Sequence, residues 1–175
     1  MQQKHNITLI GMPGVGKTTI GKALAKKIGF KFLDTDHIVL DQNHLGLQDI
    51  ITTFGDQYLI ELEEKTILSL GPLKNTLIAT GGSVVYSAKA MASLKELSLI
   101  VYLKDTFENI EKRIHNLDTR GIVGLKEKGL KGLFEERETL YTQYADLILP
   151  ITRLRQPELT DTLITASKGL LYEPS

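Results

Sequence analysis

A chain of 175 residues is expected to form one domain with a substantial buried core. Lys and Arg number 21, as do Asp and Glu, so no net field attracts nucleic acid or an anionic membrane surface. The absence of cysteine excludes disulfides and thiolate metal sites and fits a cytoplasmic location. No apolar run approaches the ~20 residues of a membrane span, and we predict neither a signal peptide nor a membrane anchor.

The first motif is the stretch 11–18, GMPGVGKT, which matches the phosphate-binding pattern G-x-x-x-x-G-K-[ST]. A β-branched apolar run at 7–10 precedes it and predicts a buried parallel strand, and apolar residues at helical spacing follow it over 19–28. This strand, glycine loop and helix form the context that the motif requires. The predicted nucleotide contacts are Gly14, Val15, Gly16, Lys17, Thr18 and Thr19. Lys17 is expected to reach the β- and γ-phosphates, and the Thr18 hydroxyl to bind Mg²⁺.

A second short strand, 31–33, ends at two carboxylates, Asp34 and Asp36. Ligands of open parallel sheets bind at the carboxyl ends of the strands. One carboxylate is therefore expected to bind Mg²⁺ or its waters, and the other to orient or deprotonate a substrate hydroxyl. The alternative is a helix N-cap at Thr35 or Asp36, and the two interpretations are compatible.

The stretch 37–71 is helical in pattern, with breaks at Gly46 and Gly55 and a stop at Gly71. Such a long helical insertion between strands predicts a subdomain beside the sheet. Its acidic run, formed by Glu61, Glu63 and Glu64, is expected to be a solvated face.

The third predicted strand, 76–79, is followed by Gly81 and Gly82. Paired glycines at a strand's carboxyl end permit close approach of a ligand, although a plain turn is the alternative. A helix is predicted over 87–97 and a fourth strand over 99–103.

After a helix at 106–114, the stretch 116–124 is polar and rich in glycine. It is interpreted either as a mobile lid that carries Arg120 over the phosphates or as a surface loop, which composition alone favours. A helix over 130–144 is expected to place Arg137 on its buried face. A fifth strand at 147–149 and a helix over 158–171 complete an α/β fold with a parallel sheet.

Taken together, these motifs resemble those of the shikimate kinases, P-loop kinases related to the nucleoside monophosphate kinases. The resemblance extends over nearly the whole chain and rests on 11–19, 33–36, 55–57 with Glu63, 80–82, 119–120 and 136–141. It implies one P-loop kinase domain over 1–175, a three-layer sandwich with a five-stranded parallel sheet. It also implies a substrate-binding insertion at about 35–62, a lid at about 115–128, and a monomer that uses ATP, Mg²⁺ and a small acceptor with a hydroxyl group.

The resemblance also implies a role for each matching residue. Lys17, Asp36 and Arg120 would be catalytic, with Asp36 contacting the acceptor hydroxyls as the candidate base. Thr18 and Asp34 would be the metal-associated pair. The expected acceptor contacts are Asp36, position 60, Gly81, Gly82 and Arg137, with Arg137 on a substrate carboxylate. Arg113, Arg155 and Pro157 match positions around the adenine.

Three positions depart from the family pattern. Ser83 replaces the third glycine of a triplet, and Gly121 replaces the proline that usually follows the lid arginine. Ile60 stands where the family has a substrate-binding arginine, so one of two expected carboxylate anchors is absent. The sequence therefore predicts an ATP-dependent kinase for shikimate or a related acceptor. The alternatives are a kinase for another polyol acid or a nucleotide, and a non-catalytic ATP-binding module.

Overall fold

The computed structural model describes residues 4–115, 119–152 and 156–167. Its centre is a five-stranded sheet in the order β2-β3-β1-β4-β5, in which every pairing is parallel. The strands are β1 (Asn6–Ile10), β2 (Lys31–Asp34), β3 (Thr76–Ala79), β4 (Leu99–Lys104) and β5 (Leu147–Pro150). All five predicted strands are confirmed, and each observed boundary lies within about one residue of its prediction.

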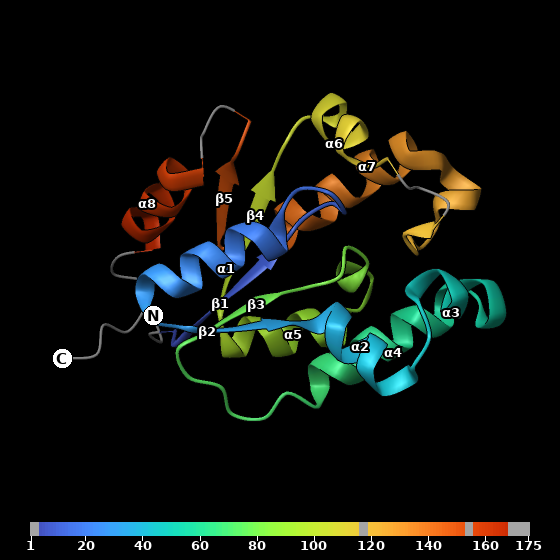
Figure 1. Ribbon diagram of the computed structural model, residues 1–175, viewed down its shortest axis with the longest axis horizontal. Helices are drawn as coiled ribbons and strands as arrows, with labels where there is room; N and C mark the ends of the chain where they lie inside the picture. The colour runs from blue at the N-terminus through green and yellow to red at the C-terminus, as the bar shows by residue number, and fades with distance from the viewer. Residues whose placement is uncertain (1–3, 116–118, 153–155, 168–175) are drawn as a thin grey trace.

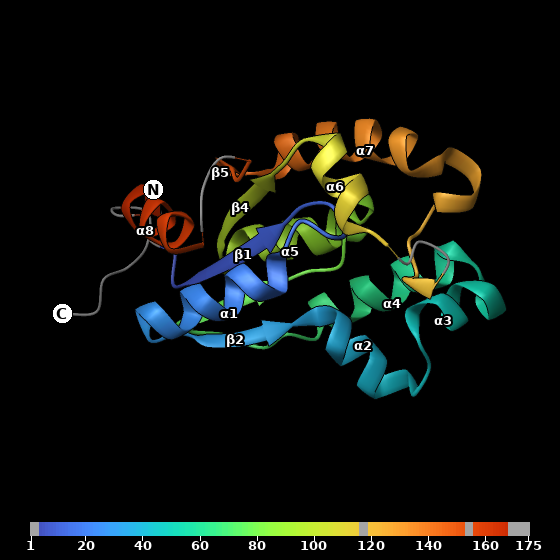
Figure 2. The same cartoon turned by 45° about the horizontal axis from the view of Figure 1, so that its top comes forward.

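Helices flank the sheet and extend beyond one end of it (Figure 1). They are α1 (Lys17–Ile28), α2 (Thr35–Asn43), α3 (Leu47–Phe54), α4 (Asp56–Leu68), α5 (Ala88–Leu97), α6 (Phe107–Arg113), α7 (Leu125–Tyr144) and α8 (Gln156–Ser167), with a short 3₁₀ turn, η1 (Val84–Tyr86). Helix α1 lies on one face of the sheet beside α8, and α5 and α7 lie on the other (Figures 1 and 2). The predicted three-layer α/β architecture is therefore confirmed. No helix among the described residues is both long and apolar enough to cross a bilayer.

The main core explains why the central strands read as continuous apolar runs. Strand β1 is buried at every position because β3 and β4 flank it and helices cover both faces. Thr8 is tolerated there because its hydroxyl shares a hydrogen bond of 2.6 Å with the Ser98 hydroxyl. The carboxyl end of this sheet is consequently a rigid platform for the loops that follow the strands.

The predicted helical insertion is a distinct layer beyond the carboxyl end of β2, built from α2, α3 and α4 (Figure 2). The expected breaks at Gly46 and Gly55 are the observed helix boundaries. A small apolar cluster of its own, Val39, Ile50, Leu59 and Val123, holds these helices together. Because Val123 comes from the segment before α7, this cluster also anchors that segment to the insertion.

Several helix boundaries differ from the sequence prediction. Helices α1 and α2 each begin two residues earlier than predicted, and α4 ends at Leu68, before the predicted stop at Gly71. Helix α7 begins at Leu125 instead of 130, because one helical turn precedes a kink at Gly129, where φ is +65°. The last residues of the predicted lid, 125–128, therefore belong to a helix. Helix α8 begins at Gln156, two residues earlier than predicted, and the predicted residues 168–171 lie outside the described part of the chain.

Candidate active site

The phosphate loop connects β1 to α1 and opens onto the N-terminus of α1. The N-cap of that helix is Gly16, at φ +101°, and neither a side-chain cap nor an acidic residue occupies the first turn. The first N–H groups and the positive end of the helix dipole are therefore available to an anion. Lys17 Nζ donates to the carbonyl oxygens of Gly11, at 2.7 Å, and Met12, at 3.1 Å.

The Lys17 ammonium is buried, and burial lowers its pKa to about 8. The Asp36 carboxyl opposes this shift, whereas the cationic groups of Arg120 and Arg137 reinforce it. A phosphate group beside this ammonium would relieve both the burial cost and the repulsion between the cations. The loop thus has the positive charge and the N–H donor groups that the phosphates of a nucleoside triphosphate require.

The end of β2 brings together the predicted metal-associated residues. Thr18 Oγ1 donates to Asp34 Oδ2 at 2.8 Å, and Asp34 Oδ1 accepts from the Asp36 N–H at 3.1 Å. The N-cap of α2 is therefore Asp34 itself, and the expected cap at Thr35 or Asp36 is wrong. A hydroxyl oxygen and a carboxylate oxygen this close together are ligands that suit Mg²⁺.

The Asp36 side chain is half-buried, and one of its two carboxyl oxygens is fully enclosed. Its Oδ1 atom is buried without a hydrogen-bond partner among the described residues. Burial is the largest cause that raises the pKa of Asp36, and the neighbouring Asp34 carboxylate adds to it, while Lys17 opposes it. A buried acceptor that no protein donor satisfies is poised to accept a hydrogen bond from a ligand.

The loop after β3 approaches these carboxyl groups closely at its glycines. A Cβ at Gly81 would lie 2.1 Å from Glu63 Oε1 and 2.7 Å from Asp36 Oδ1, so a larger residue there would displace both carboxyl groups. A Cβ at Gly82 would lie 3.0 Å from Arg137 Nη1, and the Gly82 carbonyl accepts from Tyr141 Oη at 2.6 Å. The glycine pair therefore lies between the carboxyl groups and Arg137.

Arg137 of α7 is a buried cation with a fixed orientation. It is 1% exposed; its Nη2 donates to the Val123 carbonyl at 2.7 Å, and its Nε donates to Tyr86 Oη at 3.3 Å. Its guanidinium also lies over the Tyr86 ring, 5.2 Å from the centroid. The prediction that Arg137 lies on the buried face of its helix is confirmed.

The expectation of a solvated acidic face on α4 is wrong for Glu63. This residue is 4% exposed, and its Oε2 accepts from Ser83 Oγ at 2.6 Å. Burial, followed by the charge of Asp36, raises the pKa of Glu63 to about 8. A signal was present in the sequence, because Glu63 is four residues after the buried Leu59 and four before the buried Ile67.

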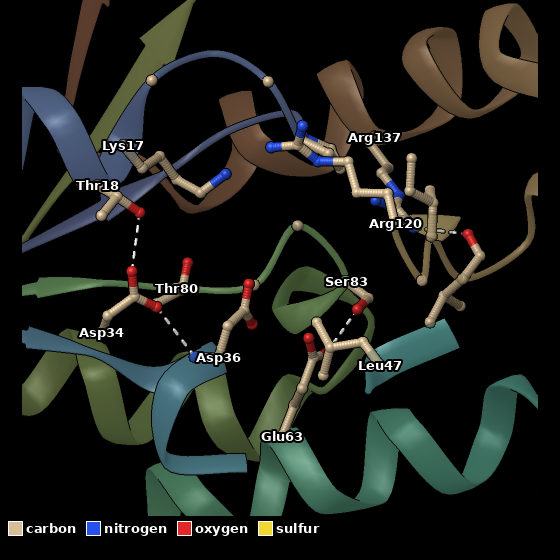
Figure 3. Close-up of a pocket in the computed structure, with 18 of the residues that line it drawn as sticks. Lys17, Thr18, Asp34, Asp36, Leu47, Glu63, Thr80, Ser83, Arg120 and Arg137 are labelled. Atoms are coloured by element: carbon tan, nitrogen blue, oxygen red, sulfur yellow. Dashed lines mark hydrogen bonds between the residues drawn. The ribbon is translucent and has the colours of Figure 1, made fainter. Parts of the chain in front are cut away.

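These residues line one cavity of about 310 Å³ at the carboxyl end of the sheet. Lys17, Arg120 and Arg137 lie along one side of it, and Asp34, Asp36 and Glu63 face them (Figure 3). The other predicted residues that line it are Gly14, Gly16, Thr18, Thr19, Gly81, Gly82 and Arg113. Residues far apart in the sequence thus line one cavity.

The adenine-side prediction is only partly described. Arg113 lines the cavity, and the buried Asp105 carboxylate holds its Nη1 at 2.7 Å, a contact that the sequence did not indicate. Arg155 lies outside the described residues, as does the side chain of Pro157. Val15 is buried in the main core, and its N–H donates to the Met12 carbonyl at 3.2 Å.

Ile60 is not among the residues that line this cavity. It packs at the edge of the apolar cluster in the insertion and lines a separate hollow of about 580 Å³ with Val123 and Tyr86. The cavity therefore has Arg137 as its buried guanidinium, and no cationic side chain extends into it from position 60.

The segment 119–124 closes one side of the cavity. Ile122 and Val123 are each 5% exposed, and the Gly124 N–H donates to Asp56 Oδ2 at 2.7 Å. Gly121, at φ +68°, lies so close to α3 that a Cβ there would be 2.5 Å from Leu47 Cβ. The segment that carries Arg120 is consequently docked against the helical insertion.

Known proteins of one family are similar to this chain over most of its length. A family model described as shikimate kinase matches residues 13–168. A shikimate kinase of Caldanaerobacter subterraneus subsp. tengcongensis is 33% identical over 163 residues, which covers 92% of this chain and 95% of that protein. A shikimate kinase of Rippkaea orientalis is 35% identical over 160 residues, or 89% of this chain and 83% of that protein.

Solved structures give the same result for the fold. Shikimate kinase from Acinetobacter baumannii, in complex with shikimate, superposes with a TM-score of 0.85 at 27% identity, covering 95% of this chain and 96% of that chain. Thymidylate kinase from Candida albicans superposes with a TM-score of 0.64 at 15% identity, covering 95% and 92%, which shows a shared fold alone.

Proposed function

The chain belongs to the shikimate kinase family, and from this premise we propose that it transfers the γ-phosphoryl group of MgATP to a hydroxyl of shikimate or a closely related hydroxylated carboxylate. The observation that carries the proposal is the arrangement of one cavity, in which Lys17 lies at the phosphate loop while Asp36 and Arg137 lie on opposite sides of the glycine pair (Figure 3).

The nucleotide half of the cavity binds the donor. The α1 N-terminus and Lys17 hold the β- and γ-phosphates, and Arg113 and Arg120 approach from the rim. Among the described residues no three His, Asp or Glu side chains form a metal cluster, so Mg²⁺ would rest on Thr18, Asp34, phosphate oxygens and water. When bound, Mg²⁺ neutralises charge on the phosphate oxygens.

The acceptor half binds the nucleophile. Arg137 pairs with the acceptor carboxylate, and Asp36 Oδ1 accepts a hydrogen bond from the reacting hydroxyl. The hydroxyl oxygen forms a bond to the γ-phosphorus, the bond from that phosphorus to the ADP oxygen breaks, and Asp36 takes the proton. Arg120 and Lys17 stabilise the charge on the transferred group.

We also propose that the chain works as a cytoplasmic monomer. Every residue assigned above comes from one chain, and the cysteine-free sequence suits a reducing compartment. Size-exclusion chromatography with light scattering at working concentration tests the monomer.

A coupled assay of ADP release over an acceptor panel tests the proposed activity. Shikimate, quinate, gluconate and a nucleoside monophosphate are compared at saturating MgATP. Phosphorylation of a hydroxylated carboxylate, lost in Asp36→Asn and weakened in Arg137→Met, is the expected result. ADP release that no acceptor stimulates would leave the chain as an ATP-binding module and overturn the proposal.

Ile60 favours a second candidate, an acceptor other than shikimate. An arginine at position 60 would add one charge-assisted hydrogen bond to the carboxylate of shikimate. Loss of such a hydrogen bond costs roughly 1.5–3 kcal/mol, which lowers the affinity for shikimate about 10- to 200-fold. Weak shikimate turnover that Ile60→Arg improves would support this candidate. A low KM for shikimate in the wild type, with no gain in Ile60→Arg, would refute it.

A further inference from the structure

Glu63 has an environment that neither the metal-associated pair nor the phosphate loop explains. It projects from α4 into the acceptor half of the cavity, close to Gly81 (Figure 3). The hydrogen bond that its carboxyl group accepts from Ser83 involves Oε2, which leaves Oε1 facing the glycine loop. The Glu63 carboxyl group therefore lines the same part of the cavity as Asp36.

The surroundings of Glu63 lack a cation that would hold it as a carboxylate. Within the described residues, no Lys, Arg or His nitrogen lies within 4.0 Å of its oxygens. The charged groups that face it are Asp36 from α2, Lys17 from α1 and Arg137 from α7. Both cations are already engaged, Lys17 by loop carbonyls and Arg137 by the Val123 carbonyl and Tyr86.

The residue one turn before Glu63 on α4 does not supply a positive charge either. Residues three apart on a helix lie side by side, and the residue three before Glu63 is Ile60. An arginine there would neutralise a carboxylate at position 63, whereas isoleucine cannot. Ionised Glu63 would thus be a buried anion without a paired cation, which is among the most costly arrangements in a protein interior.

The Asp36 carboxyl group makes ionisation of Glu63 still less favourable. Asp36 Oδ1 and Glu63 Oε1 both closely approach the position of a Cβ at Gly81, so the two carboxyl groups are near neighbours. Two carboxyl groups that share a buried site do not both ionise readily. A proton on Glu63 removes this repulsion and turns one of its oxygens into a donor.

We propose that Glu63 is a specificity-determining residue of the acceptor half, and that at neutral pH it presents a protonated carboxyl group that donates a hydrogen bond to an acceptor oxygen beside the reacting hydroxyl. This inference rests on the proposed function, because it assigns the acceptor-facing role within the same site. The pair formed by Asp36 and Glu63 then carries no more than one negative charge towards an acceptor that is itself an anion. The raised pKa of Glu63, about 8, agrees with this geometry.

Infrared spectroscopy of the free protein tests the protonation without any substrate. A pH titration should reveal a protonated carboxyl C=O band that disappears with a midpoint near pH 8 and is absent from Glu63→Gln. Glu64→Gln is the matched control, since Glu64 lies outside this cavity and accepts from Ser87, and it should keep the band. A wild-type spectrum without this band above pH 6 would overturn the proposal.

Ser83→Ala gives a test that keeps Glu63 in place. The Ser83 hydroxyl stabilises the carboxylate, so its removal should move the midpoint of the band to higher pH. An unchanged or lower midpoint would contradict the assignment. This variant keeps the proposal falsifiable even if Glu63→Gln does not fold.

Kinetics then test the role in recognition. With shikimate as the probe and MgATP saturating, the KM for shikimate should rise about tenfold between pH 7 and pH 9 as Glu63 ionises. Glu63→Gln should flatten that rise, whereas Glu64→Gln should keep it. The pKa of Lys17 is also near 8. A change in KM caused by Lys17 would persist in Glu63→Gln, so the difference between the wild type and this variant isolates the contribution of Glu63.

The two experiments separate the inference from the proposed function. An equal KM rise in wild type and Glu63→Gln would overturn the specificity role even if the infrared band is present. A protein that turns over no acceptor at all would refute the proposed function, while the infrared titration would still decide the protonation of Glu63.

Discussion

Replacement of Gly121 by alanine tests whether docking of the segment 119–124 against α3 is needed for phosphoryl transfer. A Cβ at this position would lie 2.5 Å from Leu47 Cβ and 2.6 Å from the Gln48 nitrogen. These atoms belong to the first turn of α3, so rotation of a side chain cannot relieve the overlap. The segment must move away from the insertion, and Arg120 moves with it.

The expected magnitude follows from the backbone. Gly121 has φ +68°, and an L-residue in the left-handed region costs roughly 1–2 kcal/mol before any overlap is counted. A shift of that size lowers the ratio of docked to undocked protein about 5- to 30-fold. If transfer occurs from the docked state, kcat should fall by up to about this factor from the backbone conformation, and further from the overlap with α3. The free energy of unfolding should change little, since the undocked segment escapes the strain.

Steady-state kinetics and urea unfolding measure the two effects separately. Gly29→Ala is the matched control, because Gly29 has φ +72° at the end of α1 and a Cβ there would meet nothing within 4 Å. It should lose about 1 kcal/mol of stability and keep the wild-type kcat. A wild-type kcat in Gly121→Ala would refute the idea that transfer requires the docked segment.

Three further predictions concern single residues. Lys17→Met should lower turnover at least roughly a hundredfold with the circular dichroism spectrum unchanged, and near-normal activity would reject the role of the phosphate loop. Arg120→Ala should lower kcat by up to ~10³-fold, and this loss should exceed the rise in the KM for ATP. Activity equal to that of the wild type would show that Arg120 belongs to a surface loop without a role in transfer. Folding raises the pKa of Glu63 from 4.5 to about 8, so the folded protein holds a proton that the unfolded chain releases between these values. The stability that this group contributes is therefore complete below pH 4.5 and is lost as pH rises through 8. In urea titrations Glu63→Gln should gain up to ~1.4 kcal/mol over wild type per pH unit between pH 5 and 8, and a constant difference would contradict the pKa assignment.

The sequence by itself determined the class of fold and the nucleotide half of the site. Apolar runs, helical spacing and glycine breaks are local patterns, and they identified all five strands and the helical insertion. The phosphate loop could be identified from the sequence because its residues are contiguous. Asp34 and Asp36 could be identified as candidate site residues because they directly follow a strand. Parallel topology then places the ends of those strands at one edge, which brings Thr18 to Asp34.

Only the tertiary structure decided the acceptor half. Glu63 and Ser83 are 20 residues apart, and their hydrogen bond exists because α4 packs beside the loop after β3. Ile60 packs against an apolar cluster that includes Val123, a residue far along the chain in the segment before α7. Whether a glutamate is solvated or buried depends on which helix face meets the sheet and on the charges across the gap. Helical spacing places Glu63 on the buried face of α4, but the groups that it meets there come from residues far apart in the chain, and no local pattern in the sequence encodes those contacts.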